Sequence, residues 1–101
     1  METTLSVKEN NIVEVKVAGR FSSEQTDKFL KTVNPIIQDG FSRAELDLGG
    51  LEFISSAGIR CLIIILKACK ANCTELVLKN LTPQVKDILR LTSLLDKFNI
   101  E

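Results

Sequence analysis

Over most of this chain, apolar series with helical spacing alternate with short apolar segments that are typical of strands. One helical series lies between residues 22 and 40 and a second between residues 59 and 72. The two series are Phe29, Leu30, Val33, Ile36 and Ile37, and then Ile59, Leu62, Ile63, Leu66 and Cys69. Strand-like segments lie at 44–48 and 76–78. This alternation favours crossover connections between parallel strands of one sheet.

Segments at both ends complete the expected order of elements. Alternating apolar residues on either side of a turn at 9–11 predict an N-terminal β-hairpin. Pro83 favours the start of a last helix, whose expected buried residues are Val85, Ile88, Leu89 and Leu91. We expect the apolar tail to pack back on the body through Leu94, Leu95 and Phe98. Gly49-Gly50 is interpreted as a turn. The prediction is a single α/β domain over residues 1–101, with a mixed sheet and the order β-β-α-β-α-β-α.

The composition argues against catalysis and against nucleic-acid binding. The 101 residues include 13 basic and 13 acidic side chains, so no excess of positive charge attracts nucleic acid or an anionic membrane. Histidine is absent, which removes the commonest general base and excludes a Ser–His or Cys–His nucleophile pair within the chain. We therefore expect a binding protein without catalytic residues, not an enzyme.

The three cysteines do not predict a metal site. Cys69 and Cys73 could share a helix face, but zinc would need two further ligands. We expect Cys61 and Cys69 to fill the core and Cys73 to be exposed near a helix end. No metal or other cofactor is predicted. The longest apolar run, 61–66, is too short to span a membrane and no signal-peptide pattern is present, so we expect a cytoplasmic protein without membrane insertion.

The candidate functional site is the segment 53–58, Phe-Ile-Ser-Ser-Ala-Gly, where a predicted strand passes into a predicted helix. On spacing alone, Ser55 and Ser56 could simply cap this helix, since serine is a favoured cap. A serine there would also face unpaired N–H groups and the positive end of the helix dipole, which tolerate a phosphate well. Gly58 has no side chain and is expected to let a partner approach this segment closely.

The helix after this segment carries an apolar residue on its predicted solvated side. Ile64 shares a helix face with Arg60 and Lys67. Ile64 is then either a contact for a partner helix or a half-buried residue at the helix flank.

The chain resembles the STAS domain, the family named for sulfate transporters and anti-sigma factor antagonists. The most specific segment is Leu-Glu-Phe-Ile-Ser-Ser-Ala-Gly-Ile-Arg at 51–60. Weaker likeness lies at 17–21, 46–48, 78–83 and 91–95. The resemblance implies a STAS-like mixed β-sheet with helices, and a free-standing domain of this size is usually an anti-sigma factor antagonist.

The resemblance also implies a phosphorylation switch. The family pattern is commonly Asp-Ser-Ser/Thr-Gly, whose first serine is the acceptor; aligned on the glycine, Ser56 takes that position, and Ser55 is the less favoured acceptor. Ser55 replaces the aspartate, Ala57 replaces the second hydroxyl residue, and Ser22 stands where many relatives carry an acid. The unphosphorylated domain would bind an anti-sigma factor that is also a serine kinase, and a PP2C-type phosphatase would restore binding. The expected partner-binding residues are Ser22, Ser55, Ser56, Ala57, Gly58, Arg60 and Ile64.

A second interpretation keeps the family and omits the phosphate cycle. In it, the chain is a STAS subunit of a larger assembly, such as a phospholipid-transport complex, and docks there constitutively.

Overall fold

The computed structural model describes all residues 1–101 and begins with a β-hairpin. Strand β1 (Glu2–Lys8) pairs antiparallel with β2 (Ile12–Phe21). The turn between them holds Asn10 and Asn11 at φ values of 63° and 61°. Asparagine tolerates this left-handed backbone better than most residues, which explains the Asn-Asn pair in the turn.

Five strands form one sheet in the order β1-β2-β3-β4-β5. Strands β3 (Arg43–Ile54), β4 (Glu75–Lys79) and β5 (Asn99–Ile100) continue the sheet from β2, each parallel to its neighbour. The predicted mixed sheet and the predicted order of the longer elements are confirmed. The short β5 and two 3-10 turns, Ser23–Gln25 and Leu95–Lys97, are additions that the sequence pattern did not predict.

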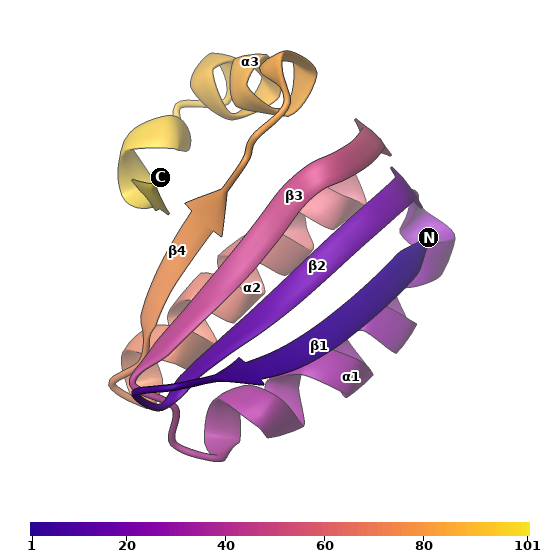
Figure 1. Ribbon diagram of the computed structural model, residues 1–101. Helices are drawn as coiled ribbons and strands as arrows, with labels where there is room; N and C mark the ends of the chain where they lie inside the picture. The colour runs from indigo at the N-terminus through magenta and orange to yellow at the C-terminus, as the bar shows by residue number, and fades with distance from the viewer.

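Two helices cover one face of the sheet (Figure 1). Helices α1 (Thr26–Gln38) and α2 (Ser56–Ala71) lie side by side behind the strands, and α3 (Pro83–Leu91) lies beyond the end of β4. Asn72 is the C-cap of α2, and the helical series expected between residues 59 and 72 lies within this helix. No helix of the chain is both long enough and apolar enough to cross a membrane.

The core fills the space between these helices and the inner face of the sheet. The rings of Phe21 and Phe29 meet there edge to face, with their centroids 4.9 Å apart. The largest fully buried side chains include Phe21, Phe29, Ile37, Leu46, Leu48, Leu62, Ile65, Leu78 and Leu89. The prediction that Leu91 is buried is wrong, because this residue is 81% exposed. Val85 and Leu89 define the buried face of α3, and a residue two positions after Leu89 points to the opposite side.

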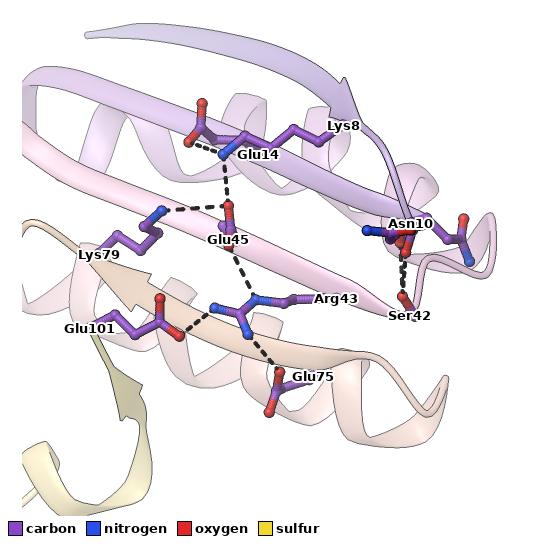
Figure 2. Close-up of polar contacts among 10 residues, drawn as sticks. Lys8, Asn10, Glu14, Ser42, Arg43, Glu45, Glu75, Lys79 and Glu101 are labelled. Carbon is purple, nitrogen blue, oxygen red and sulfur yellow. Dashed lines mark hydrogen bonds and ion pairs between the residues drawn. The ribbon is translucent and has the colours of Figure 1, made fainter.

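The other face of the sheet carries ion pairs in place of a helical layer (Figure 2). Glu45 lies at their centre and is only 7% exposed. Its carboxylate meets Lys8 at 3.0 Å, Arg43 at 3.2 Å and Lys79 at 3.6 Å. The hydrogen bond from Lys8, together with the three positive charges, holds the pKa of the Glu45 carboxyl below its usual value. Arg43 also contacts Glu75 and Glu101, so the network reaches from β1 to the end of the chain.

The Gly49-Gly50 pair lies inside β3, so its interpretation as a turn is wrong. Two shifts of register interrupt the β2–β3 pairing, between Lys16 and Ala18 and between Gly19 and Arg20. The strands approach closely at this irregularity: a Cβ on Gly50 would lie 2.7 Å from the Cβ of Ala18. Glycine therefore marks a bulge between paired strands here, not the end of a strand.

Candidate functional site

The segment Phe53–Gly58, called the corner below, joins the end of β3 to the start of α2. Phe21 and Ile54, the last residues of β2 and β3, are opposite each other in the sheet register. The backbone N–H of Ser55 donates to the carbonyl of Phe21 at 2.8 Å. Ser22 and Ser55, which follow the last residues of β2 and β3, are thereby brought together at the end of these two strands.

Ser55 is the cap of α2. Its backbone is extended, with φ −81° and ψ 168°, and its Oγ accepts a hydrogen bond from the Gly58 N–H at 3.1 Å. Its carbonyl accepts the N–H of Ile59 at 2.9 Å. The side chain thus satisfies a helix N–H that has no partner within the helix, as expected of an N-cap serine.

Ser56 is the first residue of α2 and is exposed to solvent. Its hydroxyl makes no hydrogen bond with any other residue, in contrast to the hydroxyl of Ser55. The first turn of α2 contains no acidic side chain, so the positive end of the helix dipole is not offset there. A negatively charged group on this hydroxyl would be electrostatically favourable for the helix and would lie on the exposed surface.

Gly58 serves the interior of the protein, in contrast to the expectation that it opens the surface to a partner. The residue is buried, and a Cβ added to it would lie 2.8 Å from Cγ1 of Ile54 and 3.0 Å from Cδ1 of Phe21. Contacts this short would force the neighbouring side chains to move. The missing side chain allows α2 to pack against the ends of β2 and β3.

A surface groove lies between α1 and α2 beside the corner. It has a volume of about 200 Å³ and is lined by Thr26, Asp27, Leu30, Ala57, Arg60, Cys61 and Ile64. Three residues singled out in the sequence, Ala57, Arg60 and Ile64, therefore border the same hollow. Ile64 is 43% exposed, which places it on the solvated side of α2. Charged and apolar groups available for contact thus lie together in a groove that begins at Ala57, the residue after Ser56.

Phe53 belongs to the predicted segment, but its contact with Arg20 at the ends of β2 and β3 was not predicted from the sequence. The guanidinium carbon of Arg20 lies 4.5 Å from the centroid of the Phe53 ring, and Phe53 is 39% exposed. This geometry is typical of a cation–π contact. The Gly-Gly pair upstream was the available signal, because a bulge changes which later residues of a strand point outward.

The cysteines lie where the sequence indicated. Cys61 and Cys69 are buried and Cys73 is exposed. Burial raises the pKa of the Cys69 thiol to about 11, and burial together with the nearby Asp27 carboxylate raises the pKa of Cys61. No three histidine, cysteine, aspartate or glutamate side chains are gathered in a way that could hold a metal ion.

The family model of the STAS domain matches residues 4–101. The chain belongs to the STAS domain family. Among curated proteins it is similar to BtrV of Bordetella bronchiseptica, which is named as an anti-sigma factor antagonist, with 36% identity over 64 residues. That match covers 63% of this chain and 55% of BtrV, so the chain matches only about half the length of that relative.

Solved structures show the same fold at low identity. The unphosphorylated form of the anti-sigma factor antagonist SpoIIAA superposes with a TM-score of 0.84 at 15% identity, over 99% of this chain and 88% of that chain. A Thermotoga maritima protein described as an anti-sigma factor antagonist gives a TM-score of 0.89 at 21% identity, over 97% of this chain and 84% of that one. The phosphorylated form of SpoIIAA from Bacillus gives 0.78 at 14% identity, over 99% and 91%. The chain therefore has the fold of SpoIIAA-type anti-sigma factor antagonists.

Proposed function

We propose that this STAS domain is an anti-sigma factor antagonist whose partner is chosen by the phosphorylation state of Ser56. The unphosphorylated domain binds an anti-sigma factor that is also a serine kinase, and the phosphorylated domain is released. The family, the likeness to BtrV and the existence of SpoIIAA in both phosphorylation states support this proposal.

The chief support from the structure is the different use of two adjacent hydroxyl groups. The Ser55 hydroxyl is committed to the Gly58 N–H, whereas the Ser56 hydroxyl is exposed and has no partner in the chain. In the kinase step, the Ser56 oxygen attacks the γ-phosphorus of ATP, the hydroxyl proton is lost and ADP leaves. In the reverse branch, a PP2C-type phosphatase hydrolyses the phosphoserine with water and releases inorganic phosphate.

A phosphate on Ser56 should change binding without unfolding the domain. It would add roughly −1.5 to −2 charges at the start of α2, where the helix dipole favours negative charge. The corner, residues 53–58, contains no charged side chain, and Ser22 beside it is neutral. The phosphate would therefore be the first negative charge within the corner, which has the Arg20 guanidinium stacked on Phe53 and Arg60 one helical turn after Ser56.

The docking surface proposed for the partner surrounds this serine. It comprises Ser22, Ser55, Ser56, Ala57, Arg60 and Ile64, and the last three border the groove between α1 and α2. A partner that packs on Ile64 and lies against Ser56 has no room for a hydrated dianion between them. A loss of about 1.4 kcal/mol at this contact would weaken binding tenfold, and a few kcal/mol would abolish it in practice.

The decisive experiment is incubation with the cognate anti-sigma factor kinase and ATP, followed by mass spectrometry. The wild type and Ser55→Ala should gain one phosphate, and Ser56→Ala should gain none. Constitutive docking as a subunit of a larger assembly, such as a phospholipid-transport complex, predicts no phosphate on any variant. Equal modification of Ser56→Ala and wild type would also contradict the proposal.

Titration with the anti-sigma factor tests the surface itself. Ser56→Asp and Ile64→Lys should each weaken binding while retaining the thermal transition of the wild type. Lys86→Gln, at an exposed position of α3, is the surface control and should bind normally. Unchanged affinity of Ile64→Lys would remove the groove from the docking surface.

A further inference from the structure

Strand β1 leaves one edge of the sheet open. It stands first in the strand order and pairs only with β2. The pairing is regular over seven residues, from Glu2 opposite Ala18 to Lys8 opposite Ile12, with no bulge and no proline. Its outer edge therefore presents a regular row of unpaired backbone groups, which natural proteins usually interrupt or cover.

Apolar side chains accompany this open edge. Leu5 and Val7 lie opposite Val15 and Val13, whose side chains are buried in the core, so they occupy the helix-covered face of the sheet. Leu5 is nevertheless 41% exposed and Val7 73% exposed. The helices thus leave part of the inner face of β1 uncovered, and a strand added at this edge would shelter both side chains.

The sequence of β1, Glu-Thr-Thr-Leu-Ser-Val-Lys, is complementary to itself in the antiparallel direction. We infer that a second copy of the chain pairs with β1 about a two-fold axis at Leu5. In this register Glu2 lies opposite Lys8 of the second copy, Thr3 opposite Val7, and Leu5 opposite Leu5. A shift of two residues would lose both opposite-charge pairs and shorten the overlap.

The charges of the single chain fit this register. Glu2 makes no ion pair within the chain. Lys8 bridges Glu14 and Glu45, each at 3.0 Å, and its ammonium group has a third donor that can reach a further carboxylate. The two-fold axis repeats the Glu2–Lys8 pair, so each dimer contains it twice.

The pairing leaves the proposed phosphorylation site free. Two five-stranded sheets would join into one continuous sheet, because β1 is the edge strand of each. The corner follows the end of β3, and β2 lies between β3 and the open edge at β1. The two-fold axis would put the two corners at opposite ends of the joint sheet. Dimer formation is therefore independent of the state of Ser56.

Sedimentation velocity over a range of protein concentrations tests the dimer, with any purification tag at the C-terminus. Leu5→Lys puts two ammonium groups opposite each other on the axis, and Glu2→Lys replaces both opposite-charge pairs with like-charge pairs. Each should raise the dimer dissociation constant roughly tenfold or more. Leu91→Lys and Glu52→Lys make the same chemical changes at exposed positions on α3 and β3, away from the open edge, and should leave it unchanged. A wild type that stays monomeric, or a dimer that survives both β1 variants, overturns the inference.

Cysteine cross-linking tests the register, in a Cys73→Ser background that removes the exposed native thiol. Under mild oxidation, Leu5→Cys should form a covalent dimer, because the two residues face each other across the axis. Val7→Cys should not, because its counterpart lies four residues further along the second strand. Circular dichroism confirms that both variants are folded. Cross-linking of Val7→Cys as fast as Leu5→Cys contradicts the register and with it the inference.

Discussion

Ser55 and Ser56 are chemically identical neighbours, but the fold uses only one of their hydroxyl groups, so alanine should have a different cost at each position. Ser55→Ala removes the acceptor of the Gly58 N–H, a hydrogen bond of 3.1 Å at the start of α2. Ser56→Ala removes an exposed hydroxyl that makes no hydrogen bond in the chain.

The expected magnitudes follow from these contacts. Loss of an N-cap side chain typically costs about 0.5–2 kcal/mol. Because Gly58 is buried, water cannot readily replace the lost acceptor, so we expect about 1–2 kcal/mol for Ser55→Ala. For Ser56→Ala the change should stay within about 0.5 kcal/mol of zero, since the site is exposed and alanine is the better helix former. In a domain of this length, 1 kcal/mol corresponds to about 4–8 °C in Tm.

Urea unfolding followed by circular dichroism measures both free energies, and equal m-values for the variants would indicate comparable unfolded states. Ser55→Asp is the matched control, because aspartate supplies a cap acceptor and its negative charge suits the helix N-terminus. It should regain most of the stability that Ser55→Ala loses. Equal costs at the two positions, or a larger cost for Ser56→Ala, would refute the assignment of Ser55 as the cap and of Ser56 as the free hydroxyl.

Three further predictions test the surroundings of the corner and the open sheet face. Gly58→Ala should lower the free energy of unfolding by about 1–2 kcal/mol in urea titrations, because its Cβ would lie 2.8 Å from Ile54 and 3.0 Å from Phe21. The gain in helix propensity offsets only part of that strain. An unchanged urea midpoint would mean that α2 can move away from these side chains without cost and would contradict the prediction. Glu45→Gln should be less stable than wild type at neutral pH. The folded-state pKa of Glu45 is lowered, so its contribution to stability is present above the unfolded-state pKa and is lost as the pH falls through the folded-state pKa. Plots of Tm against pH for wild type and Glu45→Gln should therefore converge in acid. A constant difference in Tm would contradict the stabilising role of the ion pairs. A thiol reagent should label Cys73 rapidly in the folded protein and reach Cys61 and Cys69 only on unfolding, and fast labelling of all three would show that the core around α2 opens.

The elements that could be predicted from the sequence are those defined by a pattern within one short segment. Periodic apolar residues were enough for α1, and the serines or the proline at the helix start added to the same pattern for α2 and α3. Gly49-Gly50 was misinterpreted because the same dipeptide suits a turn and a bulge, and the choice depends on how closely Ala18 approaches from another strand. Strand β5 has only two residues and no pattern of its own, so only its pairing with β4 defines it.

In the candidate site, too, some features depend on adjacent residues and others on contacts with distant strands. A cap and an exposed first residue are properties of a helix start, so the positions of Ser55 and Ser56 could be predicted from a few adjacent residues. The inward orientation of Gly58 depends on Phe21, more than thirty residues earlier, and could not. The contact between Arg20 and Phe53 depends on two shifts of strand register, and the charges around Glu45 come from three separate strands. Neither leaves a pattern in one segment of sequence.

These contacts explain how the corner could change its chemistry and keep its shape. Its backbone is fixed from inside the domain, by the Ser55 N–H on the Phe21 carbonyl and by Gly58 packed against Ile54 and Phe21. Its one uncommitted group is the exposed hydroxyl of Ser56. A dianion there gains from the helix dipole and disturbs none of the contacts that hold the corner. A change of state at Ser56 would therefore be expressed as a difference in the surface that a partner meets, with the fold of the domain the same in both states.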